Sequence, residues 1–238
     1  MRDNENVVLE PCSADAPRML LVPYKPEHVQ VYHDWMADER IRELTCSERL
    51  TLEEEYENQV SWHKDSKKCT FIVMDADVQF EQPRMAGDVN IFTSLEETDD
   101  GQQALVAEVE VMIAEPASLR KGLATWALRG MMAYFLSIRP DTARFVAKVL
   151  DENGASLSLF ARLGFTEFRR LPVFDEIHLC VDLISDAQAH QRLCSELANW
   201  SRRKYASEGA DISHDGQPGM KIDQLCAECS TESPRHHG

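Results

Sequence analysis

Residues 108–125 read EVEVMIAEPASLRKGLAT, and this stretch decides the fold. An apolar strand runs into a basic turn that contains Gly122, and an amphipathic helix follows. The backbone N–H groups at a helix start have no partner within the helix, and the helix dipole favours an anion there. Arg120 and Lys121 add positive charge at the same place. The turn therefore predicts a site for the pyrophosphate of a nucleotide-bearing cofactor.

Two better-known phosphate motifs do not match this turn. Its spacing is neither the P-loop G-x-x-x-x-G-K-[ST] nor the dinucleotide-binding G-x-G-x-x-G. A basic glycine turn before a helix also occurs in ordinary strand–helix connections. A second motif is needed to choose between a cofactor site and a plain connection.

The second motif lies downstream, at residues 153–165, NGASLSLFARLGF, after the strand-like residues 144–150. Together the two segments resemble the GCN5-related N-acetyltransferase (GNAT) superfamily. The first family motif reads Q/R-x-x-G-x-G/A, and Gly122 and Ala124 stand at its fourth and sixth places. The second family segment reads N-x-x-S/A-x-x-x-Y/F-x-x-x-G-F. The resemblance covers roughly residues 18–184 and points to a eukaryotic branch of the family.

This resemblance implies an α+β fold (α/β three-layer), the GNAT fold, with a mixed, mostly antiparallel central sheet flanked by helices. It also implies acetyl-CoA as co-substrate and no metal. A central strand would pair with the pantetheine arm and polarise the thioester carbonyl, a turn would hold the pyrophosphate, and two residues of the second motif would complete the site. In that order, the predicted cofactor-binding residues are Val111, Met112 and Ile113; Arg120, Lys121, Gly122, Leu123, Ala124 and Thr125; and Asn153 and Phe160.

Two glutamates are candidates for the general base. In relatives that acetylate histones, the base stands eleven residues before the first motif position, which is Leu119 here, so the matching residue is Glu108. Glu110 lies two residues further along and shares the same strand face. A carboxylate near an apolar pocket can have its pKa raised enough to accept a proton near neutrality. The alternative is that both glutamates face solvent.

The chain departs from the family pattern at two positions. Leu119 replaces the usual Gln or Arg, which displaces Arg120 by one residue from the expected phosphate contact. Phe160 stands where many relatives carry a tyrosine that protonates the leaving thiolate. Because a thiol has a pKa of about 8.5, the thiolate can leave with little help.

With only these two glutamates as candidate bases and no tyrosine as acid, an acceptor amine that is easily deprotonated is favoured. At pH 7 a lysine is only about 0.04% neutral, whereas an α-amine is roughly 10–17% neutral. We therefore expect direct acetyl transfer, within a ternary complex, to a protein or peptide amine, with the N-terminal α-amine favoured. Tubulin is a partner suggested by the family resemblance alone. The alternatives are a catalytically weak acetyl-CoA-binding scaffold and an acetyltransferase for small-molecule amines.

Composition restricts the compartment and the partners. The net charge of −16 disfavours nucleic acid and anionic membranes, and no run of 18 apolar residues predicts a membrane span. The sequence has no apolar segment typical of a signal peptide. We expect the cytoplasm, and the nucleus as well, because the odd, scattered cysteines do not form a disulfide pattern; they are Cys12, Cys46, Cys69, Cys180, Cys194, Cys226 and Cys229.

The chain is predicted to contain four parts. These are a polar N-terminal extension (1–17), the acetyltransferase domain (18–184), a C-terminal helix (185–206) and a disordered tail (207–238). The tail pairs Cys226 and Cys229 with two terminal histidines, but we expect a solvated segment there rather than a zinc site. Within the domain the predicted order is β–α–α–β–β–β–α–β–α–β–β.

Overall fold

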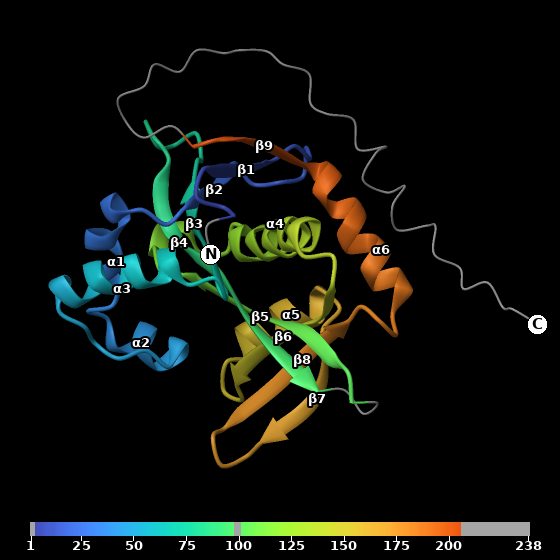
Figure 1. Cartoon of the computed structure of the whole chain (residues 1–238). Helices are drawn as coiled ribbons and strands as arrows, with labels where there is room; N and C mark the ends of the chain where they lie inside the picture. The colour runs from blue at the N-terminus through green and yellow to red at the C-terminus, as the bar shows by residue number, and fades with distance from the viewer. Residues whose placement is uncertain (1–2, 98–100, 206–238) are drawn as a thin grey trace, which may run out of the picture. The chain divides into compact units, whose positions relative to one another are not determined.

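The computed structural model describes residues 3–97 and 101–205 of the chain. The chain divides into two units, Met1–Tyr205 and Ala206–Gly238, and only the first contains described residues (Figure 1). The predicted tail, with Cys226 and Cys229, therefore lies outside them.

Strands and helices follow one another in an order close to the predicted one. The strands are β1 (Val7–Pro11), β2 (Met19–Pro23), β3 (Lys68–Asp75), β4 (Arg84–Glu97), β5 (Gln103–Ile113), β6 (Thr142–Leu150), β7 (Thr166–Leu171), β8 (Glu176–Asp182) and β9 (Trp200–Lys204). The α-helices are α1 (Val29–Trp35), α2 (Glu39–Thr45), α3 (Leu52–Lys64), α4 (Leu123–Ile138), α5 (Gly154–Arg162) and α6 (Ala187–Glu196). Short 3-10 helices are η1 (Pro26–His28), η2 (Pro116–Ser118) and η3 (Leu197–Asn199).

All nine strands of the described part form one sheet, in the order β7-β8-β6-β5-β4-β3-β2-β1-β9. Every neighbouring pair is antiparallel except β5 and β6, which are parallel and are connected through α4. The predicted α+β architecture, a mixed and mostly antiparallel sheet flanked by helices, is therefore confirmed.

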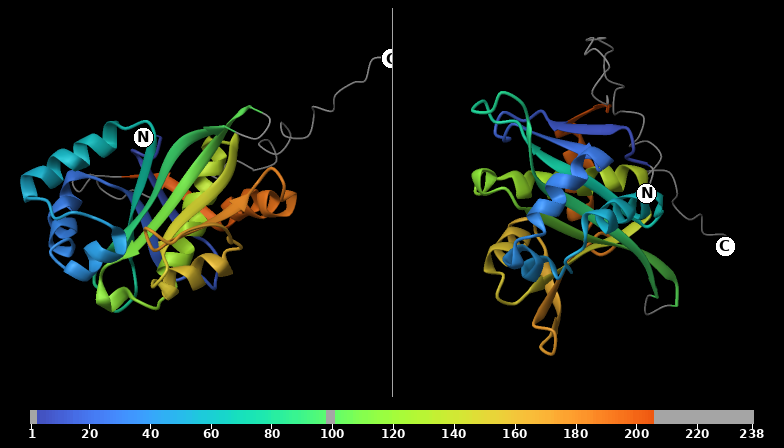
Figure 2. Two further views of the ribbon diagram at one scale, coloured as in Figure 1. Left: turned by 90° about the horizontal axis from the view of Figure 1, so that it is seen from below. Right: turned by 90° about the vertical axis from the view of Figure 1, so that its left-hand side faces the viewer.

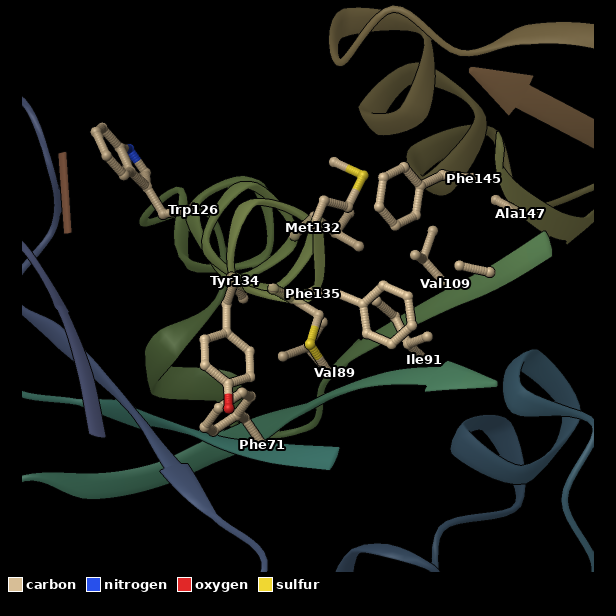
Figure 3. Close-up of a cluster of buried hydrophobic side chains, with 14 of the residues drawn as sticks. Phe71, Val89, Ile91, Val109, Trp126, Met132, Tyr134, Phe135, Phe145 and Ala147 are labelled. Carbon is tan, nitrogen blue, oxygen red and sulfur yellow. The ribbon is translucent and has the colours of Figure 1, made fainter. Parts of the chain in front are cut away.

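Helix α4 packs its apolar residues on one face of the sheet. Phe135 is fully buried and its ring lies 6.3 Å from that of Phe145 on β6 (Figure 3). Tyr134 stacks edge-on against Phe71 of β3, with 5.4 Å between ring centroids. Because large aromatic side chains bury the most apolar area, this cluster is the main source of hydrophobic stabilisation. It also holds α4 on the sheet, and the predicted pyrophosphate turn lies at the start of this helix.

Helices α1 and α3 cover part of the opposite face. Tyr32 of α1 and Trp62 of α3 pack with Ile72 of β3 in a second, smaller cluster. The two layers are visible in the left view of Figure 2, where α1–α3 lie on one side of the strands and α4 lies on the other. Thr51 begins α3 with the predicted capping box, since its side chain and that of Glu54 bond each other's backbone N–H.

Three elements differ from the sequence prediction. The polar extension contains β1, which lies between β2 and β9 in the sheet. The predicted C-terminal helix ends at Glu196, and Trp200–Lys204 instead forms β9. The short helix α2 was not predicted. Among the described residues, no helix combines the length and the apolar character needed to cross a lipid bilayer.

Candidate active site

Strands β5 and β6 separate from each other part of the way along the sheet. Their parallel register runs from Leu105↔Thr142 to Glu108↔Val146 and ends there. Strand β5 nevertheless continues to Ile113, where it still pairs with Gly87 of β4. Its β6-facing edge is therefore without a ladder partner beyond Glu108, and exposed N–H and C=O groups on such an edge can pair with an extended ligand.

The predicted pantetheine-binding residues Val111, Met112 and Ile113 lie on this separated part of β5, and all three are half-buried. An arm containing amide groups can add to such an edge in the manner of another strand. The hydrogen-bonding groups on this edge of β5 therefore fit the pantetheine arm of acetyl-CoA. The individual contacts stay a prediction.

The turn between β5 and α4 has an unusual backbone. Arg120 and Gly122 both have left-handed φ angles, of 61° and 83°. Glycine adopts this conformation without strain, whereas arginine pays roughly 1–2 kcal/mol for it. Gly122 is the N-cap of α4 and offers no side-chain cap. The N–H of Trp126 donates a hydrogen bond to the C=O of Gly122.

The first-turn residues Leu123, Ala124 and Thr125 therefore present N–H groups that have no partner within the helix. These groups lie at the positive end of a 16-residue helix, next to the exposed Arg120 side chain. This arrangement fits the predicted diphosphate site. Lys121 is placed differently, because its Nζ lies 2.9 Å from Asp75 and 3.2 Å from Asp77.

The two candidate bases have different surroundings. Glu108 is half-buried, and its Oε2 accepts a hydrogen bond of 2.7 Å from the ammonium of Lys148 on β6. Glu110 is exposed on the surface of β5. Partial desolvation, together with repulsion from Glu108 and Asp88, raises the pKa of Glu110 to about 7. Glu110 is therefore suited to exchange a proton near neutrality.

A polar row crosses the sheet beside Glu110. The register places Thr70, Asn90 and Glu110 side by side on β3, β4 and β5. Thr70 donates to the Asn90 side-chain oxygen at 2.6 Å, and the Asn90 amide donates to Asp88 at 2.7 Å. The Tyr32 hydroxyl, 3.5 Å from Asp88, contributes from α1. The row therefore extends from Glu110, at the surface, to Asp88 and Tyr32, which are buried beneath α1.

Two buried ionisable groups belong to this row. Asp88 is 2% exposed, and burial raises its pKa. Lys68 is equally buried, and burial lowers its pKa, with its ammonium 2.7 Å from the centre of the Trp62 ring. The Lys68 charge opposes the increase in the pKa of Glu110. Sequence analysis missed Lys68 and Asp88; the alternation of polar and apolar residues at 87–91 was the available signal.

The remaining predicted residues lie on α5. Asn153 caps this helix, since its side-chain oxygen accepts from the Ser156 N–H at 3.1 Å. Phe160 is buried in the main core, and its ring lies 5.0 Å from that of Phe165. Both residues therefore have structural roles, and their contacts with the cofactor stay predictions. Within the described part, no group of three or more His, Cys, Asp or Glu side chains is arranged to hold a metal.

Comparisons with known proteins agree with this geometry. The family model described as an acetyltransferase (GNAT) domain matches residues 18–166. The chain is 45% identical to an N-acetyltransferase 9-like protein of Nematostella vectensis, over 69% of this chain and 83% of the relative. It is 39% identical to a human protein named alpha/beta-tubulin-N-acetyltransferase 9, over 89% of this chain and 99% of the relative.

A solved structure with the same fold is Mycobacterium smegmatis RimJ in complex with CoA-disulfide. The TM-score is 0.60 at 16% identity, over 81% of this chain and 95% of that one. At this identity the likeness concerns the fold alone.

Proposed function

This chain belongs to the GNAT family of acetyl-CoA-dependent N-acetyltransferases, and we propose that its acceptor is the free N-terminal α-amine of a protein. The observation that carries the proposal is Glu110, on the open face of β5 where this strand separates from β6, with a pKa of about 7. An α-ammonium has a pKa of about 7.7–8.0, so proton transfer to Glu110 is uphill by about one unit.

A lysine acceptor would be a poorer match to this base. Its pKa of about 10.4 makes the same proton transfer uphill by more than three units, and each unit costs about 1.4 kcal/mol. No tyrosine stands at the position of Phe160 to assist departure of the thiolate. The proposed site therefore has one base with a pKa near neutrality and no tyrosine to protonate the thiolate. This favours the α-ammonium over the less acidic lysine ammonium as the acceptor.

Acetyl-CoA, when bound, supplies an acetyl thioester whose carbonyl carbon the neutral amine attacks. In the proposed reaction Glu110 takes one proton from the α-ammonium, which leaves a neutral amine. As the C–N bond forms, the C–S bond breaks, and the second proton released by the nitrogen passes to the departing thiolate to give free CoA. Backbone groups of Val111–Ile113 orient the thioester and stabilise negative charge on its oxygen. The turn from Arg120 to Thr125 holds the diphosphate away from the reacting atoms.

Tubulin is the first acceptor to examine. The names of several relatives, among them those from mouse, fly and human, specify α- and β-tubulin. We propose a protein substrate of this kind for this chain as well. We further propose that the enzyme acts in the cytoplasm, and in the nucleus as well, because its scattered cysteines suit a reducing compartment.

The experiment compares two peptide sets incubated with the enzyme and acetyl-CoA. One set carries a free N-terminus and arginine in place of every lysine. The other carries a blocked N-terminus and one internal lysine. Both include sequences from the N-termini of α- and β-tubulin. Intact mass reports each added acetyl group, and initial rates give kcat/KM for each set.

We expect acetylation of the free N-termini at a rate about 10-fold or more above that of the lysine set. Faster acetylation of the lysine set would overturn the α-amine proposal. No acetylation of either set above the enzyme-free control, with CoA still bound, would favour the scaffold or a small-molecule acceptor. Glu108→Gln is the matched comparison for Glu110→Gln, because both changes remove one carboxylate from the same strand face.

A further inference from the structure

Asp75 is a buried carboxylate to which neither the sequence motifs nor the proposed reaction assigns a role. It is the last residue of β3, and its side chain is 2% exposed. The Ser118 hydroxyl donates to its Oδ2 at 2.7 Å, and the Lys121 ammonium donates to the same oxygen at 2.9 Å. The N–H of Asp77 donates to its other oxygen at 3.0 Å.

These donors lie on both sides of the turn that precedes α4. Ser118 ends the 3-10 helix η2, and Lys121 stands immediately before the N-cap Gly122. Asp75 therefore holds the two ends of residues 119–120, a segment that includes the left-handed Arg120. A strained backbone persists only where its surroundings hold it in place. The contacts with Asp75 supply that restraint from a different part of the chain.

The same contacts change the role of Lys121. Its ammonium is shared between Asp75 and Asp77, and hydrogen bonding to Asp75 raises its pKa. Two carboxylates around one ammonium leave no surplus positive charge for a phosphate at this point. The Lys121 charge thus serves mainly to satisfy the buried Asp75, because an unpaired buried charge is costly.

We propose that Asp75 is a positioning residue that, through Ser118 and Lys121, holds residues 119–122 in the conformation that receives the diphosphate of acetyl-CoA. The inference concerns the donor site and is independent of which amine accepts the acetyl group. Asp75 itself does not touch the substrate. Arg120 and the N–H groups of the first turn of α4 make the phosphate contacts, and Lys121 acts through the turn.

The test measures binding of CoA and of pantetheine by titration calorimetry, without an acceptor. Asp75→Asn keeps the shape of the side chain and removes its charge. We expect the Kd for CoA to rise about 10-fold or more. The Kd for pantetheine, which lacks the diphosphate, should stay within about two-fold. Asp77→Asn is the matched control, since this second partner of Lys121 is 34% exposed and should have a smaller effect.

A double-mutant cycle separates positioning from direct phosphate binding. In the proposed arrangement, Lys121→Met weakens CoA binding in the wild-type background but adds little to Asp75→Asn. Lys121→Arg, which retains the ion pair, should restore most of the affinity. Fully additive effects of Asp75→Asn and Lys121→Met would overturn the proposal, as would unchanged CoA binding in a folded Asp75→Asn variant.

Ser118→Ala keeps the proposal testable if Asp75→Asn does not fold. This variant removes a neutral donor to Asp75 and leaves the Lys121 charge in place. We expect the Kd for CoA to rise about 3-fold or more, with pantetheine binding unchanged. An unchanged Kd for CoA in Ser118→Ala would contradict the positioning role. Steady-state kinetics should agree, with KM for acetyl-CoA raised and kcat retained at saturation.

Discussion

The two faces of the central strands β4 and β5 differ in composition. Toward α4, these strands present Val89 and Ile91, which are fully buried (Figure 3). Toward the opposite side they present Asp88, Asn90 and Glu110. Because successive residues of a strand point to opposite faces, each catalytic candidate lies one residue away from the main core. The comparison predicts that changes on one face affect stability, and changes on the other affect turnover.

The largest effect is expected for Glu110→Gln on the polar face. Loss of the proton acceptor should lower kcat by about 10²–10⁴-fold, the usual contribution of a general base. Steady-state acetylation of an N-terminal peptide at pH 8 measures it. A variant with more than a third of wild-type turnover would place the base elsewhere, and Glu108→Gln would then be the next variant to measure.

The same variant should change how stability depends on pH. The pKa of Glu110 is raised from 4.5 to about 7 in the folded protein, so the folded state binds more protons than the unfolded state between these values. The free energy of unfolding contributed by Glu110 therefore falls as pH rises from about 4.5 to about 7 and stays low above that range. Glu110→Gln should lack this decrease, as measured by urea unfolding across the pH range.

Phe135→Ala on the apolar face should have the opposite profile. Removing this fully buried ring should lower the free energy of unfolding by about 3–5 kcal/mol, because it loses apolar burial and leaves a cavity. The kcat of the molecules that remain folded should change by less than about two-fold. A large loss of kcat at a temperature well below the melting point would show that the two faces are not independent.

Lys68→Met examines the boundary between the faces. The Lys68 ammonium favours the ionised form of Glu110, so its removal should raise the pKa of Glu110 further. We expect the acid limb of the pH–rate profile to move to higher pH, with the rate retained at high pH. The exposed neighbour Lys67→Met is the matched control. An unchanged acid limb in Lys68→Met would show that the buried Lys68 charge does not influence the pKa of Glu110.

Thr51→Ala should have the smallest effect. It removes the capping box of α3, the helix that carries Trp62 over the polar face. The free energy of unfolding should fall by about 1 kcal/mol. The position of the acid limb should stay the same, because α3 supplies packing around the site rather than a reacting group. Chemical unfolding and a pH–rate profile of the same preparation provide both measurements.

Local patterns were enough to predict the helices beside the candidate site, whereas the fold was expected from the family resemblance. The amphipathic spacing after Gly122 predicts α4, and the capping box at Thr51 predicts α3; the structure contains both. Each pattern depends on residues within one or two helical turns, which is the range over which sequence spacing carries information. Strand β9 was missed because Trp200–Lys204 has no alternation of apolar and polar residues, and its pairing with β1 depends on the tertiary fold.

The electrostatic part of the site depends on long-range contacts and could not be predicted in the same way. The family resemblance matched Glu108 to the position of the base, but the structure pairs Glu108 with Lys148, 40 residues away. The sequence likewise predicted that Lys121 would bind the pyrophosphate, but its ammonium donates a hydrogen bond to Asp75, 46 residues away. Charges in a sequence are visible, but their partners are known only once the strands are in register.

The central claim is that Glu110, on the open face of β5, is the base for acetyl transfer. Its most direct test is the ratio of wild-type to Glu110→Gln kcat/KM on one N-terminal peptide, measured from about pH 5 to about pH 9. Ionisation of the acceptor cancels in this ratio. We predict that the ratio rises with pH, with a midpoint near 7, and reaches a plateau. A ratio that stays near one, or that does not change with pH, would contradict the claim.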